Sequence, residues 1–141
     1  MKSEIKGCHI INTDRFLDNR GVFTPAFKKN QSSGQLRWGK REIKQINISR
    51  NRLKGTIRGI HIQKAPHEEA KLINCIKGSI FDVVVDLRID SPTYLNWLSI
   101  ILSEENNTAL LVPEGCGHAF QTLEDDTIVH YIHSNNYAPQ E

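Results

Sequence analysis

The sequence is poor in the features that mark several large classes of protein. It contains three cysteines, Cys8, Cys75 and Cys116, which are widely spaced and form no Cys-x-x-Cys pair. An odd number of isolated cysteines indicates neither a disulfide framework nor a zinc knuckle. No apolar run approaches the roughly 20 residues of a membrane span, and the amino terminus lacks the apolar stretch of a signal peptide. We therefore expect a cytoplasmic protein, not a membrane protein, with reduced and partly buried thiols.

An excess of charge of one sign is also missing. The 18 basic and 16 acidic residues leave a net charge of +2. This balance argues against nucleic-acid binding driven by bulk charge, but it allows a local basic patch for a small phosphate ligand. The chain has 141 residues, of which 38% are hydrophobic, and a domain of this size buries a core without disulfides or metal. With no internal repeat and no linker, the sequence predicts a single domain over residues 1–141.

Long helical patterns are missing as well. In their place, short runs rich in β-branched and aromatic residues are bounded by turn residues about every ten positions, which is typical of an all-β sandwich or barrel. The predicted strands are His9–Asn12, Val22–Phe27, Ile43–Ser49, Thr56–Gln63, Lys71–Ile76, Ser79–Leu87, Trp97–Leu102, Ala109–Val112, His118–Leu123 and Thr127–His133.

The run Ser79–Leu87 shows the clearest alternation. One face is predicted to lie in the core and carries Phe81, Val83, Val85 and Leu87. The other face carries Ile80, Asp82, Val84 and Asp86. Because this second face mixes two carboxylates with apolar residues, it suits the lining of a barrel or cleft. An exposed edge face with two ordinary acids is the alternative.

Polar residues inside strand runs are the candidates for chemistry. His61 shares a strand face with Gly59 and Gln63. A half-buried imidazole there can act as a general base near neutral pH, or it can be a hydrogen-bonded structural histidine. Arg58 has the opposite parity, so it faces the same site only if the strand bends or bulges at Gly59.

Three further polar residues stand in or beside strand runs. Lys71 begins an apolar run, where its ammonium must either snorkel outward or meet an anion. A turn with the pattern Pro-x-Gly-x-x-His delivers His118 onto a strand and is similar to the second half of a cupin signature. A metal site would need a His-x-His-x-x-x-x-Glu partner motif, which the sequence does not supply, so no metal site is predicted. Tyr131 is either a general acid or a ring that caps the barrel.

Taken together, these segments resemble the nucleotide-sugar 3,5-epimerase family, that of dTDP-4-dehydrorhamnose 3,5-epimerase. The resemblance begins at Asp18-Asn-Arg-Gly-Val-Phe23, which is similar to the family's Asp-x-Arg-Gly-x-Phe pattern. It continues in the family's order over nearly the whole chain. The most specific combination is Arg-Gly-x-His-x-Gln, followed ten residues after its histidine by Lys71 and then by the turn that carries His118.

The resemblance implies a cupin-type jelly roll and an enzyme of deoxysugar biosynthesis that uses no metal or organic cofactor. Its substrate would be a nucleoside diphosphate 4-keto-6-deoxyhexose, with dTDP as the expected nucleotide. Carried over by position, His61 is the general base and Tyr131 is the acid that returns a proton to the opposite face. Lys71 and His118 would lie near the 4-keto oxygen, where a cation stabilises an enolate.

The resemblance also implies how the nucleotide is held. Tyr137 matches a position that stacks on the nucleobase, and the positions that hold the nucleotide and its diphosphate are Arg20, Gln45, Asn47 and Arg58. Arginine suits bidentate contact with phosphate. In this family the segment around Arg20 reaches into the partner subunit's site, so a homodimer is expected to complete each site.

The sequence departs from the family pattern at two places. Pro25 stands where the family usually has a glutamate. The chain ends at Glu141, whereas full-length members are longer and carry in their tail an aspartate that orients the catalytic histidine, so we expect a member that is shortened at its carboxyl end. Asp82 is a possible substitute for that aspartate.

The departures leave two alternatives to an epimerase acting at C3, C5 or both. One is a 3,4-ketoisomerase, since those enzymes are short cupins that act on the same substrate. They usually show a strand with a His-x-His pattern, which is not found here. The other is a catalytically weak module that binds a nucleotide sugar. The expected shortening at the carboxyl end and Pro25 favour this alternative, and the presence of both His61 and Tyr131 opposes it.

Overall fold

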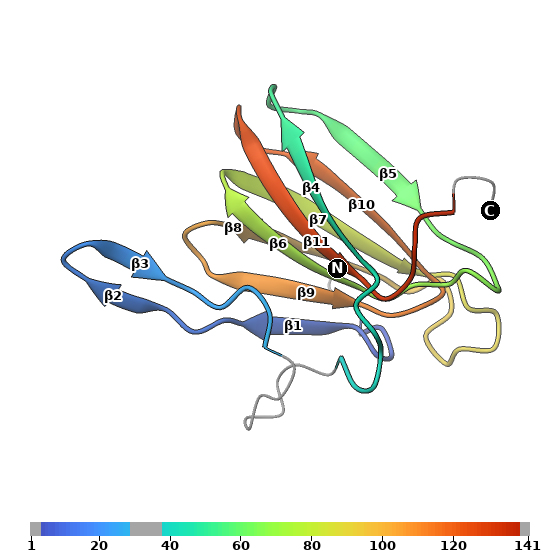
Figure 1. The fold of residues 1–141 in the computed structure, drawn as a ribbon. Coiled ribbons are helices and arrows are strands. Elements are labelled where there is room, and N and C mark those ends of the chain that lie inside the picture. The colour runs from blue at the N-terminus through green and yellow to red at the C-terminus, as the bar shows by residue number, and fades with distance from the viewer. Residues whose placement is uncertain (1–3, 29–37, 139–141) are drawn as a thin grey trace.

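The computed structural model describes residues 4–28 and 38–138, and these form eleven strands and no helix (Figure 1). The all-β class is therefore confirmed. In these ranges nothing forms a helix long and apolar enough to cross a membrane. The strands are β1 (His9–Asn12), β2 (Phe16–Asp18), β3 (Gly21–Phe23), β4 (Gln45–Asn51), β5 (Ile57–His61), β6 (Lys71–Lys77), β7 (Ser79–Asp86), β8 (Trp97–Ser103), β9 (Thr108–Val112), β10 (Cys116–Thr122) and β11 (Thr127–His133).

Each predicted strand corresponds to an observed one, and the differences lie near the amino terminus. The short strand β2 was not predicted, because a three-residue run carries too little alternation to be recognised. The prediction of a strand to Phe27 is wrong, since β3 ends at Phe23. Pro25 follows two residues later, and a proline cannot donate a hydrogen bond to a ladder.

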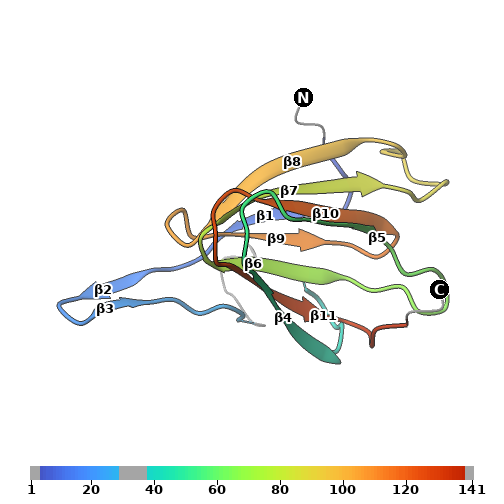
Figure 2. The ribbon, with the colours of Figure 1, turned by 90° about the horizontal axis from the view of Figure 1, so that it is seen from above.

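Two antiparallel sheets face each other and form a sandwich (Figures 1 and 2). The first has the order β1-β9-β6-β11-β4 and the second the order β5-β10-β7-β8. The strands β2 and β3 form a separate hairpin that projects from the body of the sandwich (Figure 2). Strand β4 forms one edge of the first sheet and β5 one edge of the second, and the candidate site lies between these two edges.

The core fills the space between the two sheets. The first sheet supplies Ile73 and Leu110, the second supplies Ile80 and Leu102, and none of the four side chains is exposed to solvent. Burial of each such side chain contributes about 1.5–3 kcal/mol. A smaller cluster around Trp38 includes Leu72 and Ile132. The thiols of Cys75 and Cys116 are buried and free, as predicted.

Strand β7 buries the face that carries its two carboxylates. Ile80, Asp82, Val84 and Asp86 are fully buried, while Phe81 on the other face is 39% exposed. The prediction that the face of Phe81 forms the core is therefore wrong. Both faces of the strand carry apolar residues, so alternation alone does not tell which face is buried. The prediction that the mixed face lines the interior is confirmed.

Asp86 shows how a carboxylate is accommodated inside this sandwich. It accepts hydrogen bonds from Arg88 Nε at 2.8 Å and from the hydroxyls of Ser91 and Thr93, each at 2.6 Å. These bonds hold the pKa of Asp86 well below its usual value, although burial acts in the opposite direction. A buried charge is tolerated when it is paired and hydrogen-bonded in this way.

A bulge in β5 brings Arg58 and His61 to the same side of the strand. In the pairing with β10, His61 stands opposite His118 and Arg58 opposite Phe120, so β5 has one residue more than its partner. The bulge contains Gly59, whose φ is +111°. A Cβ atom at Gly59 would lie 2.6 Å from the carbonyl oxygen of His118, so only glycine fits here. The bulge that Arg58 and His61 need in order to face the same site is therefore present.

Replacement of Gly59 by alanine tests whether this close approach fixes the bulge. We expect Gly59→Ala to lower the free energy of unfolding, measured by urea denaturation, by about 3 kcal/mol or more. Gly55→Ala is the matched control, because Gly55 also has a positive φ, of +86°, but has nothing within 4 Å of a Cβ atom. It should cost about 1–2 kcal/mol. Equal losses in the two variants would contradict this explanation of the bulge.

Candidate active site

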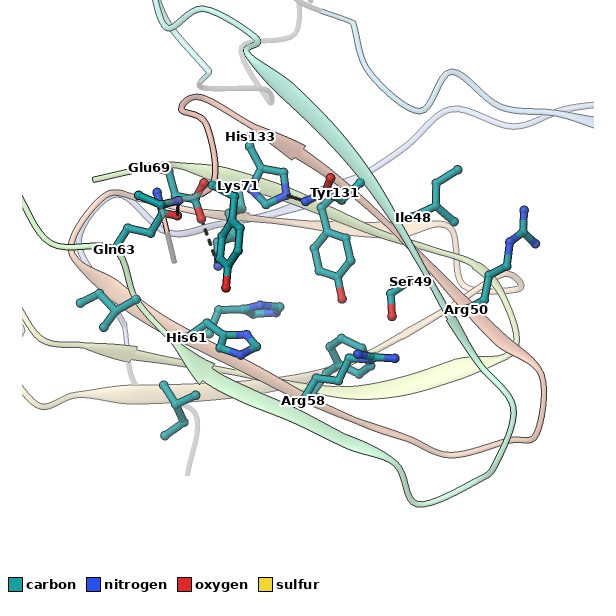
Figure 3. A pocket seen from close by; sticks show the side chains of 17 residues that line it. Ile48, Ser49, Arg50, Arg58, His61, Gln63, Glu69, Lys71, Tyr131 and His133 are labelled. Carbon is teal, nitrogen blue, oxygen red and sulfur yellow. Dashed lines mark hydrogen bonds and ion pairs between the residues drawn. The ribbon is translucent and has the colours of Figure 1, made fainter. Parts of the chain in front are cut away.

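A cavity of about 730 Å³ opens between the edges of the two sheets (Figure 3). Its walls come from β4, β6 and β11 on one side and from β5 and β10 on the other. The predicted site residues that line it are Asn47, Arg58, His61, Lys71, His118, Tyr131 and Tyr137. The fold therefore brings together seven side chains that are spread over some ninety positions of the sequence.

His61 lies at the end of β5 and faces the cavity without a fixed partner. No hydrogen bond or ion pair to its side chain occurs in the part of the chain that the structure describes. Partial burial lowers the pKa of His61, and the positive charges of Lys71, His118 and Arg58 lower it further, while Glu69 acts in the opposite direction. The lowered pKa keeps the imidazole neutral at neutral pH, so it can accept a proton.

Lys71 is the first residue of β6 and is 8% exposed. Its Nζ lies 3.5 Å from Oε1 of Glu69. Burial lowers the pKa of Lys71, and the carboxylates of Glu69 and Asp82 oppose that effect. Of the two arrangements that the sequence allowed for this ammonium, the structure shows contact with an anion.

His118 is held by a buried carboxylate. Its Nε2 lies 2.5 Å from Oδ1 of Asp82, and the side chains are 3% and 0% exposed. Among the described residues, Oδ2 of Asp82 has no hydrogen-bond partner. Asp82, considered as a substitute for the aspartate that orients the catalytic histidine, binds His118 instead.

Tyr131 projects into the cavity from β11, the strand that faces β5 across the opening (Figure 3). Its ring packs against those of His118, Phe120 and His133, with centroids 5.9–6.4 Å apart. Burial raises the pKa of Tyr131 well above its usual value, although Ser49 opposes the effect. The side chain therefore stays a phenol and can donate a proton.

Arg58 and Tyr137 occupy the solvent-exposed mouth of the cavity. The Nε of Arg58 donates a 2.8 Å hydrogen bond to Oδ1 of the buried Asn51, which fixes the guanidinium, and no described residue hydrogen-bonds its terminal nitrogens. Tyr137 is 67% exposed, and its backbone N–H donates to Oε1 of Gln45. Exposed basic and aromatic groups at a cavity mouth suit a phosphate and a flat ring, respectively.

Two of the predicted site residues do not line the cavity of this chain. Arg20 lies in the turn between β2 and β3 and pairs with Asp18, with its Nη2 2.6 Å from Oδ2. The side-chain amide of Gln45 is engaged by Tyr137 and by Asn47. Their contacts with a ligand stay predictions.

The sequence-based prediction missed Glu69 and His133, both of which line the cavity. The Nδ1 of His133 lies 2.9 Å from Oε2 of Glu69. A signal was present in both cases, because His133 shares a strand face with Tyr131 and Glu69 precedes Lys71 by two positions. Over the described ranges, no group of three His, Cys, Asp or Glu side chains is arranged to hold a metal ion.

A β-sandwich of antiparallel sheets is the architecture of jelly-roll domains, which in other proteins often hold a small ligand in a cavity of this kind. The chain belongs to the family whose model is described as dTDP-4-dehydrorhamnose 3,5-epimerase, which matches residues 2–141. A curated relative of that name from Sinorhizobium fredii is 38% identical over 127 residues, which are 86% of this chain and 62% of the relative. The family resemblance seen in the sequence is therefore confirmed.

Solved structures agree with this assignment. The dTDP-4-dehydrorhamnose 3,5-epimerase of Bacillus anthracis, solved with TDP and PPi bound, has a TM-score of 0.89 and 38% identity, covering 99% of this chain and 79% of its own. The dTDP-6-deoxy-D-glucose-3,5-epimerase of Legionella pneumophila, in complex with dTDP-4-keto-L-rhamnose, has a TM-score of 0.90 and 32% identity, covering 100% and 73%. These matches confirm the cupin-type jelly roll.

The chain spans about three fifths of the length of the curated relatives from Sinorhizobium fredii (62%) and Mycolicibacterium smegmatis (60%).

The electrostatic coupling between Lys71 and His61 is testable without a substrate. Lys71→Met removes a positive charge that lowers the pKa of His61, so the titration midpoint of His61, followed by NMR of its Cε1 proton, should rise by roughly one pH unit. Lys77→Met, at the exposed far end of the same strand, should leave the midpoint unchanged. An unchanged midpoint in Lys71→Met would contradict the coupling.

Proposed function

We propose that this protein is a cofactor-independent isomerase that inverts C3, C5 or both of a nucleoside diphosphate 4-keto-6-deoxyhexose. The observation that carries the proposal is that His61 and Tyr131 project into one cavity from opposite sheets, beside the buried ammonium of Lys71. The names of the family and of its relatives support the substrate class.

The chemistry follows from the protonation states of the three side chains. Neutral His61 removes a proton from the carbon next to the ketone, and the charge that develops on the ketone oxygen is stabilised by Lys71. His118 lines the same cavity and supplies a second contact to that oxygen. The phenol of Tyr131 returns a proton to the opposite face of the enolate, which inverts the carbon.

The mouth of the cavity receives the nucleotide. The terminal nitrogens of Arg58 contact the diphosphate, and the exposed ring of Tyr137 stacks on the nucleobase. Asn47, which lines the cavity, contacts the nucleotide portion of the substrate. Gln45 supports that contact by holding Asn47 and the backbone of Tyr137. All these contacts arise from β4, β5 and the segment after β11.

The hairpin formed by β2 and β3 completes the site of a second subunit. It exposes apolar side chains that a monomer would leave in water: Phe16, Leu17, Val22 and Phe23 are 50–71% exposed. Arg20 lies at the tip of this hairpin, outside the cavity of its own chain. We therefore propose a homodimer in which the hairpin carries Arg20 to the partner's cavity.

Hydrogen exchange in deuterated water tests the reaction. The wild-type protein, incubated with dTDP-4-keto-6-deoxyglucose, should exchange the protons at C3, C5 or both, as followed by ¹H NMR. His61→Asn should slow this exchange by roughly 10²–10⁴-fold, the usual contribution of a general base. Exchange at C3 with movement of the carbonyl from C4 to C3 would mean a 3,4-ketoisomerase instead. Binding without exchange in the wild-type protein would mean a binding module.

The role of Tyr131 has a separate signature. Tyr131→Phe keeps the base and the ammonium, so it should retain proton exchange while net inversion is lost. The same NMR spectra distinguish the two results, because exchange removes a signal and inversion changes the couplings of the ring protons. Loss of both exchange and inversion would contradict a dedicated acid at Tyr131.

Complementation between two inactive variants tests the exchanged hairpin. A dimer formed from one Arg20→Ala subunit and one His61→Asn subunit contains one fully wild-type site if Arg20 acts on the partner. Co-refolded mixtures should therefore regain about a quarter of the wild-type activity, because half of the random dimers are mixed and each has one intact site of two. No recovery in mixtures that sedimentation shows to be dimeric would mean that Arg20 does not act across subunits.

A further inference from the structure

A continuous chain of hydrogen bonds runs from the mouth of the cavity to Lys71. The backbone N–H of Tyr137 donates to Oε1 of Gln45 at 3.0 Å, and Nε2 of Gln45 donates to Oδ1 of Asn47 at 2.9 Å. Next, Nδ2 of Asn47 lies 3.2 Å from Nε2 of His133, and Nδ1 of His133 lies 2.9 Å from Oε2 of Glu69. The chain ends at the ion pair between Glu69 and Lys71.

The direction of every bond in this chain follows from its first donor. A backbone N–H can only donate, so Gln45 presents its oxygen to Tyr137 and its NH₂ group to Asn47. Asn47 then accepts with its oxygen and donates through its NH₂ group, so Nε2 of His133 must be the acceptor. His133 is therefore a neutral imidazole that carries its proton on Nδ1 and donates it to Glu69, which remains a carboxylate.

Glu69 and its partners are buried. The exposed fractions of Glu69, Lys71 and His133 are each 8%. An ammonium taken out of water loses several kcal/mol of solvation unless an anion compensates it, and Glu69 is the carboxylate in direct contact with Lys71. Its second oxygen is occupied by His133, so the carboxylate cannot turn away from Lys71 without breaking a hydrogen bond.

Other titratable groups face Lys71 from the neighbouring strands. They are His61 and Arg58 of β5, Asp82 of β7, His118 of β10, and Tyr131 and His133 of β11, while β9 places Val112 opposite it. Asp82 is engaged by His118. Burial disfavours a charged Lys71, and the carboxylates of Glu69 and Asp82 oppose that effect, Glu69 more strongly.

We propose that Glu69, clamped by His133, is a positioning residue that keeps Lys71 in its ammonium form at the reacting end of the cavity. The chain through Asn47 and Gln45 holds His133 in the tautomer that donates to Glu69. Because the benefit to catalysis presupposes the reaction proposed above, the state of Lys71 is measured separately from activity.

The direct test is the titration of Lys71 in the 141-residue chain. In protein labelled with ¹³C-lysine, the Cε signal of Lys71 is identified by its loss in Lys71→Met. Glu69→Gln keeps the size of the side chain but removes its charge, so the titration midpoint of Lys71 should fall by roughly one to three pH units. Glu68→Gln, at the exposed neighbouring position, should leave it unchanged. An unchanged midpoint in Glu69→Gln overturns the proposal whatever the activity does.

Activity supplies a second and independent readout. Glu69→Gln should lower kcat by roughly ten- to a hundredfold with little change in KM, because Lys71 stabilises charge that exists only in the transition state. The alkaline limb of its pH–kcat profile should move to lower pH. A purely structural role would lower the melting temperature without moving that limb, and this result also overturns the proposal.

His133→Phe tests the clamp. Phenylalanine keeps an aromatic ring but has no N–H to donate to Glu69, so kcat should fall several-fold and less than in Glu69→Gln. A kcat equal to that of the wild type would remove His133 from the proposal. If the wild-type protein catalyses no proton exchange, the proposed function fails, and the titration of Lys71 in Glu69→Gln still decides this inference.

Discussion

Charge buried between two β-sheets must be paired, and this constraint determines how the cavity is built. Asp82 pairs with His118, and Glu69 pairs with both Lys71 and His133. The first pair joins β7 to β10, and Glu69, which precedes β6, reaches His133 of β11, so these strands must be in register before the buried polar groups are satisfied. The groups left without a fixed partner, such as His61, are then those available to a substrate.

The bulge at Gly59 turns this set of pairs into one site. Without the extra residue, Arg58 and His61 would point to opposite faces of β5. With it, Arg58 and His61 line the same cavity. The close approach of Gly59 to the backbone of β10 is therefore a structural requirement for the arrangement of the site.

Much of the fold was predictable, because turn residues and alternation mark short antiparallel strands clearly. Which face of β7 is buried was not predictable, since Phe81 and Ile80 are equally apolar and only the partners of Asp82 and Asp86, far away in the sequence, decide it. The cavity-lining role of Lys71 and His118 came from motif and family resemblance. Glu69 was missed because an acidic residue in a polar turn looks like ordinary surface until the fold places it beside His133.

The most direct measurement of the whole account is a crystal structure of His61→Asn with dTDP-4-keto-6-deoxyglucose bound. The account predicts the ketone oxygen within hydrogen-bond distance of Lys71, the diphosphate beside Arg58, and the C3 or C5 proton directed at position 61. A sugar bound outside this cavity, or a ketone oxygen directed away from Lys71 while Lys71 remains on Glu69, would contradict it.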